Sequence, residues 1–412
     1  MMSKKSPQLR FEGFTDDWEE RKLKELFQPS KNKNNNGLYN QKDILAASLG
    51  TELIPKRTFF GLKSTRESVK NYRIVKTGDL IYTKSPIKGF PNGIIRSNKG
   101  NVGIVPPLYC VYTLQKDINS SIIQLYFEDK NRLDFYLFPL VNVGARNNVN
   151  ITDLEFLEGK VTIPKSYEEQ SKIVQFMEQL NTTIALHQRK LDLLKEQKKG
   201  YLQKMFPKNG AKVPELRFAG FADDWEERKL GEVATLSSSK RIHLSDYVTE
   251  GIPFYRGSEI STGGITGNQE LFISQEKFDE IKEKYGVPSE GDILVTAVGT
   301  LGNLWKVDSR RFYYKDGNLI QISKMQVNSD YLLTYFTGGI GKKRLLDSAA
   351  GSNQKALTMV KIREITVDFP SEDEQKKIGA FFKSLDDTIA LHQRKLDLLK
   401  EQKKGFLQKM FV

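Results

Sequence analysis

Residues Ile184–Phe206 read IALHQRKLDLLKEQKKGYLQKMF, and residues Ile389–Phe411 read IALHQRKLDLLKEQKKGFLQKMF. The two copies differ only where Tyr201 of the first corresponds to Phe406 of the second. Self-similarity at a long, fixed interval is typical of chains built from repeated structural units. The duplicated segment therefore predicts a tandem repeat.

A second pair of similar segments stands at nearly the same interval. Pro7–Glu25 and Pro214–Glu232 differ at four of nineteen positions, and both contain the run DDWEERKL. Each unit thus opens with a Trp-containing segment, continues through a body of different sequence and closes with the duplicated segment. We expect five regions: body 1–165, helix 166–206, linker 207–213, body 214–370 and helix 371–412.

Apolar residues in the closing segments recur at steps of four and three. A heptad spacing sustained over more than four heptads predicts a coiled-coil seam on a helix of about 50 Å. Since the two seams are nearly identical, we expect the helices to pair with each other, antiparallel. Ser166 and Ser371 offer capping-box chemistry at the two helix starts. The predicted seam comprises Ile173, Met177, Leu180, Ile184, His187, Leu191, Leu194, Tyr201 and Met205, and in the second copy Ile378, Phe382, Leu385, Ile389, His392, Leu396, Leu399, Phe406 and Met410.

His187 and His392 interrupt the seam at matching positions. Two facing histidines could ligate a metal ion, or a polar seam residue could fix the register of the coiled coil. We favour the second interpretation because no carboxylate or cysteine at ligand spacing accompanies them. No metal site is expected.

The bodies differ in sequence but share a pattern. Gly78-Asp79 and Gly291-Asp292 each precede a short apolar run, which predicts a turn that enters a strand. Both bodies are typical of mixed α/β (α+β) domains with short strands and glycine-rich loops.

Composition limits the possible functions. Of the 412 residues, 38% are hydrophobic and 28% are charged, as expected of globular domains. The single cysteine excludes an internal disulfide framework, and no apolar run approaches the roughly 20 residues of a membrane span. Glycine-rich nucleotide-binding motifs are missing, and His243 is expected in a surface loop. We therefore expect a binding scaffold without catalytic residues, located in the cytoplasm.

Two variable bodies alternating with near-identical helices, the Trp18–Leu23 segment with its copy Trp225–Leu230, and the Gly-Asp strand resemble the specificity subunit of type I restriction-modification systems. The resemblance covers essentially the whole chain. It implies two target recognition domains, each reading half of a bipartite, asymmetric site in double-stranded DNA, separated by helices that set the spacing. It also implies two methyltransferase (modification) subunits and two restriction (translocase and nuclease) subunits as partners, which would hold S-adenosylmethionine, ATP and Mg. A coiled-coil adaptor whose bodies bind proteins is the alternative.

Polar and basic loops are the candidates for DNA contact, because phosphates are bound by Lys, Arg, Asn and Ser and base edges by side chains that enter a groove. In the first body we predict Lys84, Lys88, Arg146, Asn147 and Asn148. In the second body we predict Lys240, Arg241, Arg256, Ser258, Arg310, Arg311, Ser352, Asn353 and Lys355.

The net charge of +13 is unevenly distributed. Each duplicated segment holds six basic and two acidic residues, so the two copies together carry +8. The bodies are thus nearly neutral overall, and any DNA-binding surface on them must be local. The basic helices are suited either to DNA phosphates or to acidic surfaces of partner subunits.

Overall fold

A computed structural model describes residues 6–49, 53–55, 69–87, 89–140, 151–208, 210–267, 269–351 and 355–412. Within these ranges, no helix is both long and apolar enough to cross a bilayer. The chain forms two compact units, Met1–Gln188 with Arg394–Val412, and Arg189–Gln393. The boundary falls inside both long helices, so each unit contains one body, the start of one long helix and the end of the other.

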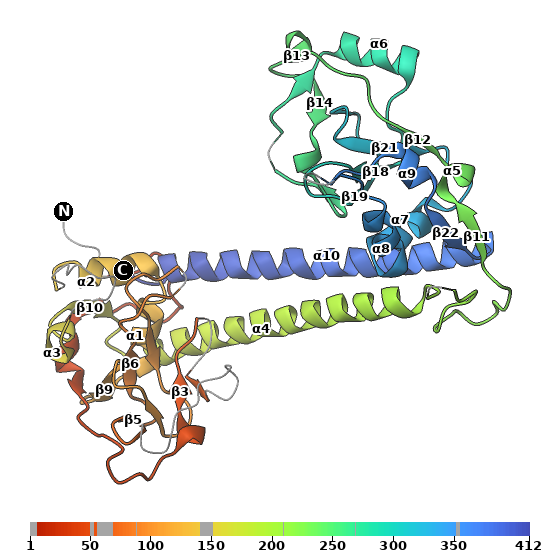
Figure 1. Ribbon diagram of the computed structural model, residues 1–412. Coiled ribbons are helices and arrows are strands. Elements are labelled where there is room, and N and C mark those ends of the chain that lie inside the picture. The colour runs from red at the N-terminus through yellow and green to blue at the C-terminus, as the bar shows by residue number, and fades with distance from the viewer. Residues whose placement is uncertain are drawn as a thin grey trace. The chain divides into compact units, whose positions relative to one another are not determined.

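The long helices are α4 (Tyr167–Lys204) and α10 (Glu372–Lys409), with 38 residues each (Figure 1). In the first unit, the start of α4 and the end of α10 share a hydrophobic core, in which Phe176 and Phe406 stack edge to face at 4.9 Å. In the second unit, the end of α4 and the start of α10 do the same, with Tyr201 and Phe381 at 5.1 Å. The helices are therefore antiparallel.

All the predicted seam residues are buried or half-buried. Four leucines off the seam are exposed, among them Leu193 at 50% and its duplicate Leu398 at 58%, whereas Leu202 and its duplicate Leu407 are buried in the cores of the two bodies. The periodicity of the sequence thus separates a packed face of each helix from an exposed one.

A two-stranded antiparallel ribbon precedes each long helix. It pairs β1 (Glu19–Lys22) with β10 (Lys160–Ile163) in the first body and β11 (Glu226–Lys229) with β22 (Thr366–Phe369) in the second. The registers correspond, since Glu19 lies opposite Ile163 and Glu226 opposite Phe369. The near-identical opening segments therefore have the same structural role in both units.

The ribbon is followed in each body by a four-stranded antiparallel sheet. The strand order is β2-β9-β6-β7 in the first body and β12-β21-β18-β19 in the second. The strands are β2 (Phe27–Pro29), β6 (Leu80–Tyr82), β7 (Ile95–Ser97) and β9 (Cys110–Leu114), and β12 (Thr235–Ser237), β18 (Ile293–Thr296), β19 (Leu304–Lys306) and β21 (Leu319–Ser323).

The predicted Gly-Asp turns into β6 and β18 are confirmed. Gly78 has φ +88° and Gly291 φ +93°, a region that favours glycine. The carboxylates of Asp79 and Asp292 accept hydrogen bonds from the backbone N–H groups of Lys76 and Ser289, at 2.7 and 2.9 Å.

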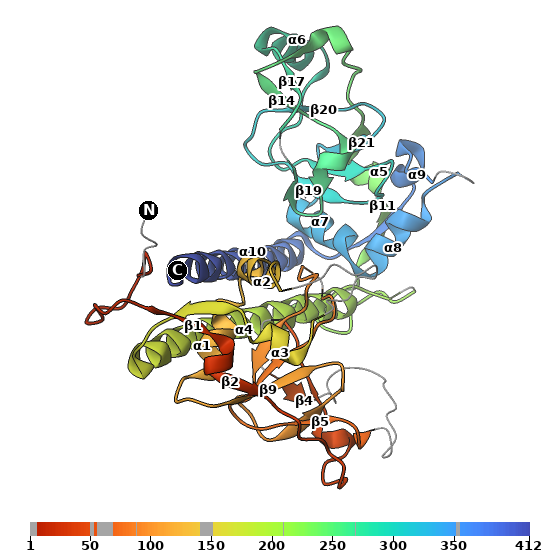
Figure 2. The same ribbon diagram turned by 90° about the vertical axis from the view of Figure 1, so that its left-hand side faces the viewer.

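Three helices in each body complete the shared framework. They are α1 (Ser120–Tyr126), α2 (Lys130–Leu137) and α3 (Asp153–Phe156) in the first body, and α7 (Ser329–Thr337), α8 (Gly339–Asp347) and α9 (Met359–Arg363) in the second. In Figures 1 and 2, the C-terminal end of α10 lies beside α2. The framework repeats although little of the body sequence does.

The bodies differ in what they add to this framework. The first adds the pairs β3 (Leu45–Ala46) with β4 (Ile54–Pro55) and β5 (Arg73–Val75) with β8 (Gly103–Val105). The second adds a sheet β13-β17-β14-β20, helix α6 (Gln275–Tyr285) and a β15-β16 hairpin (Ile260–Ser261, Gly264–Ile265). Its short helix α5 (Leu230–Val233) lies where the first body has a 3-10 helix, Leu23–Glu25. Figures 1 and 2 show α6 on the side of the second body farthest from α7 and α8. The added sheet consists of β13 (Tyr247–Val248), β14 (Ile252–Tyr255), β17 (Phe272–Ile273) and β20 (Tyr313–Tyr314).

Ion pairs between a partly buried arginine and a buried glutamate join each opening segment to a long helix. Arg10 donates two hydrogen bonds to Glu169, at 2.6 and 2.8 Å, and Arg217 donates two to Glu374, both at 2.8 Å. The expected capping boxes do not form, because these glutamates lie at the position that would close the box and bind arginine instead. Only half of one box is present, where Ser166 Oγ accepts from the Glu169 N–H at 3.3 Å.

Candidate nucleic-acid interface

The same two segments meet in both bodies, namely the one just beyond the strand that follows the Gly-Asp turn and the one just before the short helix α3 or α9. In the first body, Lys84 just beyond β6 donates to the Ile151 carbonyl before α3. In the second body, the Leu357 N–H before α9 donates to the Ala297 carbonyl just beyond β18, at 2.9 Å. The framework thus brings equivalent loops together on both bodies.

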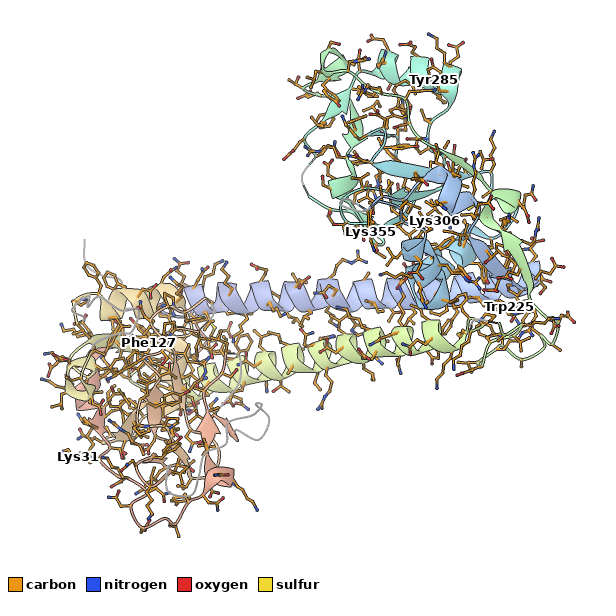
Figure 3. The ribbon with its side chains drawn as sticks, in the orientation of Figure 1. Lys31, Phe127, Trp225, Tyr285, Lys306 and Lys355 are labelled. Atoms are coloured by element: carbon orange, nitrogen blue, oxygen red, sulfur yellow. The ribbon has the colours of Figure 1, made fainter. Side chains whose placement is uncertain are left out.

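A cavity of about 690 Å³ lies at this position in the first body. The loop after β2, the start of β5 and the start of α3 form its walls, and Figure 3 shows Lys31 at the margin of this body. Three cations and one carboxylate face the cavity, which favours an anionic or polar ligand. The cavity is lined by Gln28, Pro29, Ser30, Lys31, Lys33, Arg73, Thr152, Asp153 and Leu154.

Asp153 is the centre of a polar cluster beside this cavity. It pairs with Arg73 at 2.5 Å and lies 3.8 Å from Lys84. Burial raises the pKa of Asp153, but hydrogen bonds from Cys110 and Arg73 and the charges of Arg73 and Lys84 outweigh it, and the net pKa is below the ordinary value. Burial, with Asp153 next to it, raises the pKa of Cys110 to about 11, so a neutral thiol donates to an ionised carboxylate.

Of the candidates predicted for the first body, Lys84 therefore lies within this cluster, with about a fifth of its side chain exposed. Lys88, Arg146, Asn147 and Asn148 lie outside the described residues, as do Ser352 and Asn353 of the second body.

Two candidates of the second body, Lys240 and Arg311, contact α6. Lys240 Nζ lies 4.9 Å above the Tyr285 ring at its end, and Arg311 donates to Gln275 and lies 5.3 Å above Phe278 near its start. Arg241, next to Lys240, lies 3.6 Å from Asp316. Tyr285 is labelled on α6 in Figure 3. The structure thus places two cations from distant parts of the sequence against the two ends of one helix.

Arg256 and Arg310 are each held by carboxylates. Hydrogen bonds to Glu270 and Glu259 raise the pKa of Arg256, and Asp308 binds Arg310 and raises its pKa. Arg310 also lies 5.4 Å above the Trp305 ring. Such pairs orient a guanidinium but offset part of its charge.

Two candidates are exposed and are not placed in these clusters. Ser258 lies in a short 3-10 helix, Gly257–Glu259, next to Arg256. Lys355 lies on the segment that leads into α9 and is labelled in Figure 3. DNA contact by any of these residues stays a prediction.

Four charged residues of the cavity were not predicted from the sequence: Lys31, Lys33, Arg73 and Asp153. The polar run of residues 31–36 signals a loop, and a basic residue follows the first sheet strand at the same interval of 207 in both bodies, Lys33 and Lys240. Arg73 and Asp153 give no such signal, because only the fold brings them together.

Within the described residues, no three His, Cys, Asp or Glu side chains form a group that could hold a metal ion. His187 and His392 are half-buried on the seam faces of α4 and α10. Their role in register stays a prediction.

This chain is similar to known proteins both in sequence and in fold. Residues 15–196 and 222–401 match the family model described as type I restriction modification DNA specificity domain. The type I restriction enzyme MjaVIII specificity subunit of Methanocaldococcus jannaschii is 22% identical over 310 residues, which cover 70% of this chain and 72% of that protein.

Two solved structures have a similar fold. The S subunit of a type I restriction-modification system from M. genitalium matches with a TM-score of 0.63 at 14% identity, over 99% of both chains. A structure described as showing complex assembly and conformational transition of the type I R-M system matches with a TM-score of 0.50 at 16% identity, over 96% of this chain and 97% of that one. The similarity of fold thus extends over nearly the whole chain, both units included.

Proposed function

The chain belongs to the family of type I restriction-modification DNA specificity subunits, and from this premise we propose that each body reads one half of a bipartite, asymmetric DNA site. The two DNA-recognition domains are those matched by the family model. One observation carries the proposal: a repeated framework holds different loops and added elements at equivalent positions. Two different reading surfaces on one framework suit two different half-sites.

The long helices would set the number of unread base pairs between the half-sites. Their pairing is antiparallel within each unit, and each is about 57 Å long at 1.5 Å per residue. Two paired helices bend less than one, so their length would hold the two recognition domains at a fixed distance.

The exposed leucines of the duplicated segments support the docking of modification subunits. Leu186 and Leu193 of α4 and their duplicates Leu391 and Leu398 of α10 are at least half exposed, which is unusual for apolar residues that recur every seven positions. Since each helix carries one such set, we infer two modification subunits. Two restriction subunits would complete the complex, and S-adenosylmethionine, ATP and Mg would be bound by these partners, which would carry out methylation and cleavage.

Methylome sequencing of a host that carries this chain with its partner subunits tests the proposal. We expect adenine methylation at a bipartite, asymmetric motif. A continuous palindrome would contradict it.

The salt dependence of DNA binding distinguishes the DNA-recognition subunit from the alternative, an adaptor that binds proteins. Phosphate contacts release counterions, so DNA binding by the assembled complex should weaken steeply as salt rises. Binding that does not depend on salt, or no DNA binding, would favour the adaptor.

A further inference from the structure

The cavity of the first body contains an arginine oriented by a carboxylate. Arg73 lies at the start of β5 and its Nη1 contacts Asp153 Oδ2 at the start of α3. The side chains of Arg73 and Asp153 are 22% and 23% exposed, so the pair is at the surface of the cavity and not in the core. Both residues line the cavity.

Arg73 retains donors for a ligand. A guanidinium has five N–H groups, and among the residues that the structure describes the side chain makes only the Asp153 contact. Guanine presents two acceptors, O6 and N7, in the major groove, and a bidentate arginine is the commonest specific contact to it. An arginine that is already oriented loses less conformational entropy when it binds.

Asp153 is in turn fixed by groups behind it. The Cys110 thiol donates to its carboxylate, and Lys84 lies 3.8 Å away and bridges to the Ile151 carbonyl. Lys31 and Lys33 are exposed on the loop that forms another wall of the cavity. Cations beside an oriented arginine suit a duplex, in which phosphates flank the base edge.

The second body provides an internal comparison. Thr152 and Thr358 cap α3 and α9, and each lies eleven residues before the end of the following strand, β10 or β22. The first residue of the helix is Asp153 in one body and Met359 in the other. The second body therefore has no carboxylate at the position where Asp153 orients Arg73 in the first body.

We propose that Arg73 reads a guanine in the half-site bound by the first body, that Asp153 is its positioning residue, and that Lys31 and Lys33 contact the flanking phosphates. This inference rests on the proposed function and assigns one position of one half-site.

The test uses the complex assembled with its modification subunits. The methylome first gives the motif, and a panel of duplexes then carries each of the four base pairs at each position of both half-sites. We expect a G·C pair in the first body's half-site to be preferred. Arg73→Gln and Arg73→Lys should each lower that preference at least about tenfold and leave all other positions unchanged. Asp153→Asn should lower it at the same position by a smaller factor.

Controls separate reading from folding. Met359→Leu in the second body should change nothing at this position, whereas Lys31→Ala should weaken binding to all duplexes alike and reduce the salt slope by about one. If Arg73→Gln assembles poorly, Arg73→Lys keeps the charge and the partner of Asp153 but lacks the rigid planar fork of two parallel N–H donors.

Two outcomes would overturn the inference: unchanged base preferences in both Arg73 variants, or an equal loss on every duplex, as expected of a structural ion pair. A wild-type complex with no bipartite motif would instead overturn the proposed function, and the two failures are therefore distinguishable.

Discussion

The two tryptophans of the opening segments occupy equivalent places but differ in one hydrogen bond. Trp18 Nε1 donates to Glu169 at 3.2 Å, whereas Trp225 Nε1 is buried and has no partner among the described residues. Both rings pack edge to face against a phenylalanine at the end of a duplicated segment, Phe411 and Phe206. The loss of ring area on substitution is therefore similar at both positions.

Trp18→Phe should consequently destabilise its unit more than Trp225→Phe does. A hydrogen bond to a charged group contributes about 1.5–3 kcal/mol, and the removal of an unsatisfied buried donor has no such cost. Urea unfolding of the two variants, with hydrogen exchange to assign the loss to a unit, measures the difference. Equal losses in the two units would show that the Trp18 hydrogen bond contributes nothing.

Identical lysines in the duplicated segments have different partners. Lys403 pairs with the buried Glu128 of the first body at 2.7 Å, whereas Lys198 pairs with Asp386, whose side chain is half exposed, at 2.5 Å. Lys403→Met should destabilise by about 3 kcal/mol, because it leaves a buried carboxylate without this cation, and Lys198→Met by at most about 1 kcal/mol. Thermal unfolding at neutral pH compares them.

The effect of Lys403→Met should depend on pH. Burial raises the pKa of Glu128, but the charges of Lys403 and Arg96 outweigh it and the folded pKa lies below the ordinary 4.5. A depressed pKa contributes stability that is present above about 4.5 and is lost as the pH falls through the folded value. The difference between wild type and variant should therefore shrink in that acidic range, and a constant difference down to low pH would contradict the assignment to Glu128.

At the scale of elements, three glycines inside the long helices differ in the space around them: two are in open space and one is tightly packed. A Cβ on Gly200 or Gly405 would meet nothing within 4 Å, whereas one on Gly379 of α10 would lie 2.8–2.9 Å from Asn328, Asp330 and Tyr331 at the start of α7. The α4 residue at the position of Gly379 is Val174, which is buried in the first core. The first body thus leaves room for a side chain at a point where the second body does not.

Alanine at these glycines should therefore change stability in opposite directions. Gly200→Ala and Gly405→Ala should each stabilise by up to about 1 kcal/mol through higher helix propensity, and Gly379→Ala should destabilise by about 1–3 kcal/mol through overpacking. Denaturant midpoints measure all three. A stabilising Gly379→Ala would show that α7 and α10 can move apart without cost.

Prediction from sequence was best where a repeat or a period carried the information. The helix seams, the duplication and the Gly-Asp turns followed from spacing alone. Ser166 and Ser371 were assigned to capping boxes, because the pattern could not show that Arg10 and Arg217, nearly 160 residues away, bind Glu169 and Glu374. The cavity beside Arg73 was missed for the same reason, since its walls come from three separate segments and basic residues in loops give little signal of their own.

At the scale of the whole molecule, the helices have to change together if they set the distance between half-sites. Seven residues inserted into both α4 and α10, within the duplicated segments, preserve the heptad seam and add about 10 Å at 1.5 Å per residue. At 3.4 Å per base pair this corresponds to about three base pairs. We expect methylome sequencing of that variant to show the same two half-sites with a gap longer by about three. The same insertion in α4 alone leaves one heptad, with its two seam residues, without a partner, and should abolish methylation at every site instead of shifting the gap. A double insertion that methylates with the original gap would show that something other than helix length sets the spacing.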